Sequence, residues 1–125
     1  MALPKCFLYV VLVSFYCLSA STVGRSQTVV DIRNDLPKKS QVQLQLRCGK
    51  GSSFNLKLGA HSTLTVGAQD LACSFLWTPF FATLDVYQAQ RDKGHRTVYW
   101  SVRQDGFYQS SDASNWKFVD RWFSD

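Results

Sequence analysis

Two pairs of side chains in this sequence have residue types that could support chemistry. The first pair is Cys48 and Cys73, which could bind a metal ion or form a disulfide bond. The second pair is His61 and His95, which with a lysine could supply the acid, the base and the phosphate clamp of a secreted ribonuclease. The spacing of each pair, and the elements that carry it, decide between these alternatives.

The spacing favours neither catalysis nor metal binding. Cys48 and Cys73 lack the close CxxC or HxxxH spacing that completes a zinc site, so we expect no metal ligands. Nothing in the local sequence brings His61 near His95, and the alternative is that both lie in solvated loops. No carboxylate pair or glycine-rich phosphate loop stands out. We therefore expect no catalytic residue and no cofactor, and the ribonuclease is kept as a third alternative.

The most polar stretch of the chain, residues 88–96 with the sequence QAQRDKGHR, is the candidate site for binding a partner. Loops on a rigid scaffold are common sites of recognition. The arginines at 91 and 96 could each form a forked pair with an acidic residue of a receptor. A solvated hairpin loop is the alternative, because charged runs usually have that role. The candidate residues are Gln90, Arg91, Asp92, Lys93, His95 and Arg96.

The first 21 residues have the pattern of an export signal. Lys5 gives a short positive region, residues 6–20 are almost wholly apolar, and small residues occupy 19–21. This pattern predicts cleavage after Ser21, with cleavage up to residue 26 also open, and leaves residues 22–125 as one domain. The apolar run is shorter than the ~20 residues of a spanning helix, and no second run follows, although an uncleaved anchor is the alternative. We expect a secreted, extracellular protein that does not insert into membranes after signal removal.

The chain is mildly basic. Without Lys5 it has 13 lysine and arginine side chains against nine acidic ones, all of them aspartate. This balance favours acidic surfaces such as cell walls, lipid headgroups or acidic receptor loops. It lacks the dense basic stripe that nucleic acids require, so we expect no nucleic-acid partner.

An oxidising compartment favours a disulfide bond between the cysteines that remain after export. Cys6 and Cys17 leave with the signal, so Cys48 and Cys73 form the remaining pair. Two separate buried thiols are the alternative. Both cysteines fall in the inward phase of alternating segments, which is the placement that a bridge across a core requires.

Alternating apolar and polar side chains predict a β protein. In residues 97–103, Val98, Trp100 and Val102 share one face, and Asp105-Gly106 is typical of a type I′ hairpin turn. Similar runs recur roughly every 8–12 residues, which gives about eight short strands. We expect an all-β fold, a small antiparallel β-sandwich, with strands within residues 28–34, 41–48, 54–58, 63–66, 71–77, 82–88, 97–108 (the hairpin) and 116–123.

The aromatic side chains allow two interpretations. Tryptophans and phenylalanines could fill the core of the sandwich, which is their usual place. Phe80-Phe81 or Trp122-Phe123, if exposed, could instead form a docking patch or a platform for stacking sugars.

Several of these segments together resemble the plant self-incompatibility S1 proteins, also called S-protein homologues. The resemblance runs from Val30 to Trp122. It depends on the order and spacing of the matching segments in a secreted chain of this size. The matching segments are Val30-x-Ile32-x-Asn34-x-Leu36, Leu44-x-Leu46-x-Cys48, Cys73-x-Phe75-x-Trp77, Leu84-Asp85-Val86-Tyr87, Trp100-Ser101-Val102-x-x-Asp105-Gly106-x-Tyr108 and Trp122.

The sequence departs from the family's pattern in three places. Arg47 replaces a common histidine, and residues 49–53, GKGSS, replace an acidic run. His95 and Val98 stand where two further cysteines are usual. Loss of both cysteines implies that they pair with each other in relatives, which supports Cys48–Cys73 as the surviving bridge. It also implies that the segment at 88–96 is less tethered here.

The resemblance implies a β-sandwich and a secreted, non-enzymatic protein ligand in plant cell–cell recognition or signalling, with a cell-surface receptor protein as its partner. The alternative from another class is a secreted basic defence protein that binds membranes or wall sugars. The oligomeric state and the particular biological process stay open.

Overall fold

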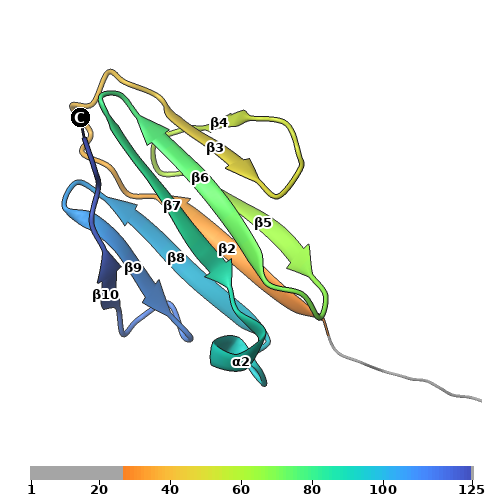
Figure 1. Ribbon diagram of the computed structural model, residues 1–125. Coiled ribbons are helices and arrows are strands. Elements are labelled where there is room, and N and C mark those ends of the chain that lie inside the picture. Colours follow the sequence, from red (N-terminus) through yellow and green to blue (C-terminus); the bar gives the residue numbers. More distant parts are fainter. Residues whose placement is uncertain (1–26, 125) are drawn as a thin grey trace, which may run out of the picture.

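The computed structural model describes residues 27–124, and within them nine strands form two sheets beside one short helix (Figure 1). The expected export signal at 1–21 lies outside the described residues and stays a prediction. The elements are β2 (Thr28–Asn34), β3 (Leu44–Cys48), β4 (Phe54–Leu56), β5 (His61–Val66), β6 (Leu71–Trp77), β7 (Phe80–Tyr87), α2 (Ala89–Asp92), β8 (Thr97–Arg103), β9 (Gly106–Ser110) and β10 (Lys117–Asp120).

The two sheets have five and four strands. The order is β10-β9-β8-β2-β5 in the first sheet and β4-β3-β6-β7 in the second. The all-β fold is confirmed, but the expectation of a wholly antiparallel arrangement is wrong for one pair, because β2 runs parallel to β8. The chain passes through the whole second sheet between these two strands, and a parallel pair requires such a long crossover.

Alternation places the core side chains as expected. Val30 and Ile32 of β2 and Val98, Trp100 and Val102 of β8 are almost completely buried. The predicted strands at 41–48 and 54–58 are too long, however, since β3 begins at Leu44 and β4 ends at Leu56. Their outer ends are exposed because β3 and β4 pair only between Leu44–Leu46 and Phe54–Leu56, and alternation does not reveal where backbone pairing stops.

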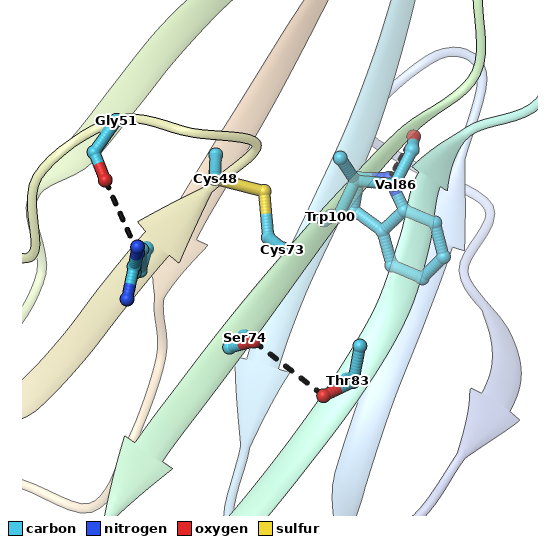
Figure 2. The surroundings of a disulfide bond; sticks show 8 residues. Cys48, Gly51, Cys73, Ser74, Thr83, Val86 and Trp100 are labelled. Carbon is cyan, nitrogen blue, oxygen red and sulfur yellow. Dashed lines mark hydrogen bonds between the residues drawn. A yellow bond between two sulfur atoms is a disulfide. The ribbon is translucent and has the colours of Figure 1, made fainter.

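The two sheets pack face to face and share one core. Phe75 of β6 and Phe107 of β9 lie with ring centroids 4.9 Å apart across the interface. The indole nitrogen of Trp100 donates a hydrogen bond of 2.8 Å to the carbonyl oxygen of Val86 on β7 (Figure 2). The tryptophan therefore fills the core and also satisfies a backbone acceptor of the opposite sheet.

The disulfide bond between Cys48 and Cys73 is confirmed, but its place differs from the expectation. The cysteines are direct partners in the β3–β6 register, with Cα atoms 4.0 Å apart. The bond therefore joins neighbouring strands of one sheet instead of crossing the core between sheets (Figure 2). The inward phase was correct for both residues, but phase does not show which sheet a strand joins.

The hairpin between β8 and β9 is present, with its loop shifted by one residue. Arg103 pairs with Gly106, so Gln104 and Asp105 form the loop and the expected central pair, Asp105-Gly106, is wrong. Gly106 has φ +149°, and a Cβ atom there would collide with the carbonyl oxygen of Asp120. The glycine is needed because the backbone after β10 passes directly against it.

The last described residues tie the two sheets together. Phe123 and Phe81 exchange two backbone hydrogen bonds of 2.9 Å, so residues after β10 cover the edge of β7. Trp122 packs between Trp77 and Phe107 with its ring tilted to both, and its indole nitrogen donates to the carbonyl of Arg103. The core interpretation thus holds for Trp122, which packs on the core, whereas Phe81 and Phe123 are exposed and their role as a docking patch stays a prediction.

Candidate functional site

The polar segment at 88–96 is partly helical. Its residues 89–92 form the single turn of α2, which lies beyond the end of β7 and beside β8 (Figure 1). Asp92, expected among the partner-binding residues, is 3% exposed. A carboxylate at that depth is tolerated only where hydrogen bonds and a countercharge surround it.

Asp92 has both the hydrogen bonds and the countercharge that its burial requires. Its carboxylate accepts hydrogen bonds from Arg91 Nε at 2.8 Å and Nη2 at 2.7 Å, from the Gln88 backbone at 2.9 Å and from Gln109 Nε2 at 3.2 Å. Arg91 also donates to the carbonyl of Asp85 and lies 5.6 Å from the Trp100 ring centroid. Nε and Nη2 of Arg91 therefore donate within the molecule, and the guanidinium charge neutralises Asp92.

These contacts set the protonation of Asp92. Burial by itself raises the pKa of the carboxyl group, but the hydrogen bonds from Arg91 and Gln88 and the charge of Arg91 outweigh it, so the pKa lies below the usual 3.8. Asp92 is thus ionised at neutral pH and pins α2 to β9 through Gln109. The resemblance implied a less tethered segment here, and this carboxylate provides a tether.

A hollow of about 240 Å³ lies between α2 and the end of β9. Arg91, Asp92 and His95 line it from the predicted segment. The other predicted residues, Gln90, Lys93 and Arg96, are exposed and lie outside its lining. The remaining lining residues are Thr97, Val98, Gln109, Ser110, Ser111, Asn115 and Lys117.

The sequence reasoning missed the wall that follows β9. A signal for it was available, because an antiparallel hairpin at Asp105 returns the chain to the start of β8, and Tyr99 indeed pairs with Ser110. The residues directly after Ser110 are therefore expected near the start of β8.

The wall after β9 is ordered by Asp112. Its carboxylate accepts hydrogen bonds of 2.8 Å from the backbones of Ser114 and Asn115 and from Ser110 Oγ. These bonds hold the pKa of Asp112 far below its usual range. Ala113 adopts φ +63°, a left-handed conformation that this network stabilises.

The charge around the hollow is positive on balance, although the ionised Asp112 of the wall after β9 contributes one negative charge. Asp92 is neutralised by Arg91, whereas Lys93, Arg96 and Lys117 are exposed and have no ion-pair partner within residues 27–124. An acidic side chain could pair with these cations without displacing an internal contact. Among the described residues no three His, Cys, Asp or Glu side chains form a group suited to a metal ion.

The two histidines are held apart. His61 pairs with Arg33 near one end of β2, and Thr28 at the other end donates a hydrogen bond to the carbonyl of His95. At ~3.3 Å per residue, the strand separates the two histidine backbones by roughly 17 Å. His61 Nδ1 instead lies 3.1 Å from Asp31. The geometry does not support the ribonuclease alternative, because an acid–base pair must reach the same phosphate.

A model of one known protein family matches nearly all of the described residues. The family model of plant self-incompatibility protein S1 matches residues 29–122. The chain belongs to the plant self-incompatibility S1 family. The match includes both sheets, α2 and the disulfide pair.

A solved structure agrees with this family. It is the structure of SPH (self-incompatibility protein homologue) proteins, described as a widespread family of small, highly stable, secreted proteins from plants. Its TM-score is 0.64 at 18% sequence identity, and the match covers 81% of this chain and 98% of that chain. At this identity the likeness shows the fold. No curated protein sequence matches the chain.

Family and fold agree with the expected localisation, and this S1-family chain is a secreted protein. Within the part of the chain that is described, no helix is long and apolar enough to span a membrane.

Proposed function

We propose that this S1-family protein is a secreted, non-enzymatic ligand that binds a cell-surface receptor protein in plant cell–cell recognition. The observation that carries the proposal is the hollow between α2 and β9, with Lys117 in its lining and Lys93 and Arg96 next to its lining residues along the chain. These three exposed cations have no ion-pair partner among residues 27–124. We call this surface, formed by residues 88–96 and the residues after β9, the corner of the sandwich. The receptor contributes acidic side chains to it.

The chemistry of the corner supports a binding role. Exposed cations steer an acidic partner during encounter and select against basic ones. Asp92 fixes the backbone that carries them, so little conformational entropy is lost on binding. Of the predicted residues, Lys93, His95 and Arg96 face the receptor, whereas Arg91 and Asp92 hold the corner in shape.

Charge reversal tests the proposal. The double variant Lys93→Glu/Arg96→Glu should bind intact cells of the responding tissue at least tenfold more weakly in a saturation assay with labelled protein. The control is Lys38→Glu/Lys39→Glu, which changes the net charge equally but follows the opposite end of β2. That control should retain binding, and circular dichroism should show that both variants are folded.

Two results would contradict the proposal. Equal loss of binding in both variants would mean that net charge, not this corner, attracts the protein to cells. Strong binding to anionic liposomes without saturable binding to cells would favour the membrane-active defence protein instead.

A further inference from the structure

The outer face of the four-stranded sheet exposes large apolar side chains that the receptor proposal does not use. Val42, Leu76, Phe81 and Phe123 are between 41% and 43% exposed. Phe81 and Phe123 lie side by side, with ring centroids 6.5 Å apart, and Val42 and Leu76 line one hollow. Apolar side chains that adjoin one another on one face can mark a binding surface.

The strand register arranges part of this face in a row. Asn55 of β4 pairs with Gln45 of β3, Gln45 with Leu76 of β6, and Leu76 with Phe81 of β7. The backbone bridge to Phe123 extends the row beyond β7. At ~4.8 Å between strands, the row is roughly 19 Å long. Amide side chains occupy one end and aromatic rings the other.

Two hollows, of about 370 and 300 Å³, lie along this row and share Gln45 and Leu76. They therefore adjoin one another across the strands. Leu46 and Phe75 lie in the core beneath them, and the Cys48–Cys73 bond cross-links β3 to β6 (Figure 2). The groove is thus preformed on a rigid sheet, as small-ligand sites usually are.

The polar side chains of the groove are almost all uncharged. Asn55 Nδ2 donates 2.7 Å to Gln43 Oε1, and Ser74 and Thr83 face each other at 3.5 Å (Figure 2). Both contacts are exposed to solvent. Arg47 is the one charged side chain among the described residues that line the two hollows, and its Nε donates to the carbonyl of Gly51.

We propose that this groove binds a neutral oligosaccharide. The apolar faces of the sugar rings pack on Phe81 and Leu76, while Gln45, Asn55 and the hydroxyl pair of β6 and β7 bind the sugar hydroxyls. The near absence of charge selects the ligand, since a membrane surface or a nucleic acid would need several exposed cations here. This site lies on the outside of the second sheet and is independent of the receptor proposal.

A titration followed by NMR tests the site. The probes are β-1,4-linked hexasaccharides of glucose, xylose and mannose. At least one of them should shift the backbone and side-chain amide signals of Gln45 and Asn55 in a saturable manner. Phe81→Ala should weaken that binding at least tenfold, and Gln45→Ala, which leaves the aromatic pair intact, should weaken it severalfold.

Phe118→Ala is the matched control, because Phe118 is 50% exposed but lies on β10 of the other sheet. It should bind the sugar like the unaltered protein. Absence of shifts with all three sugars at saturating concentration would overturn the proposal. Shifts that instead depend on protein concentration without sugar would overturn it too, since they would assign the face to a second copy of the chain.

Discussion

At the scale of single residues, one buried carboxylate shapes the candidate site. Asp92 is almost inaccessible, yet four hydrogen bonds and the charge of Arg91 stabilise its ionised form. A polar stretch such as QAQRDKGHR suggests a solvated loop, because the sequence does not reveal which charged side chain points inward. As a consequence, the exposed cations Lys93 and Arg96 lie on a backbone that Asp92 holds in place.

Replacing this carboxylate should lower stability in a pH-dependent manner. Asp92→Asn loses the charge-assisted bonds and should reduce the free energy of unfolding by about 1–3 kcal/mol at neutral pH. The folded pKa of Asp92 lies below 3.8, so its contribution is present above that pH and is lost as the pH falls through the folded value. Urea unfolding at pH 7, 5 and 3 should therefore show the variant and the parent converging in acid.

The control for this prediction is Asp85→Asn. Asp85 is exposed and accepts one side-chain bond, from Gln88, so its replacement should change stability little. Asp112 also titrates at low pH, but it does so in all three proteins and cancels in the comparison. A pH-independent deficit in Asp92→Asn would show that the carboxylate's charge does not carry the effect.

At the scale of elements, cross-links within and between strands hold the sandwich. The Cys48–Cys73 bond joins β3 to β6 where the two cysteines are register partners. The residues after β10 cross from the first sheet to the second, where Phe123 pairs with Phe81. One sheet is thus fixed internally by a covalent bond, and the two sheets are joined after β10 by backbone hydrogen bonds and by Trp122, which packs against Trp77 and Phe107.

Removal of the disulfide should be costly. Closure of a segment with a sequence separation of 25 stabilises the fold by about 3.5 kcal/mol in the chain-entropy model. The double variant Cys48→Ala/Cys73→Ala should therefore unfold at least ~10 °C below the oxidised parent in a thermal scan. Reductant should lower the parent's midpoint and leave the variant unchanged. If the oxidised parent and the variant unfolded at the same midpoint temperature, this stabilising role of the disulfide would be contradicted.

At the scale of the whole molecule, one tryptophan couples the two sheets. Trp100 is 1% exposed, and its indole nitrogen bonds to the carbonyl of Val86. Val86 lies at the irregularity of the β6–β7 register, between Asp85 and Tyr87, which pair with Ala72 and Leu71. The indole therefore satisfies an acceptor that strand pairing leaves out, from the opposite side of the core.

Removing the hydrogen bond between Trp100 and Val86 should lower the free energy of unfolding more than removing a similar bond nearer the surface. Trp100→Phe leaves a buried carbonyl unsatisfied and a small void, which should cost about 2–4 kcal/mol. Trp77→Phe is the comparison, because the Trp77 indole donates 2.9 Å to Ser40 Oγ at a part-buried site where water can replace it. Its cost should stay below ~1.5 kcal/mol in urea unfolding. Equal losses of unfolding free energy in the two variants would mean that the hydrogen bond to Val86 contributes no more than the bond to Ser40.

The sequence by itself determined which segments contain strands, the inward faces of those strands and the cysteine pair, but not the strand ends. Val98, Trp100 and Val102 alternate within a few residues, and burial of one face follows from that local pattern. The pairing of Cys48 with Cys73 followed from the export context and the number of cysteines left, and it is confirmed.

Tertiary structure alone decided which sheet each strand joined and which polar groups turned inward. An alternating strand offers the same apolar face to either sheet, so the pattern could not show that β3 and β6 are neighbours or that β2 runs parallel to β8. The same limit applies to Asp92, since its burial depends on Gln109, which is distant along the chain. Alternation is a property of neighbouring residues, whereas strand order and buried charge pairs are set by contacts between distant segments that lower the free energy together.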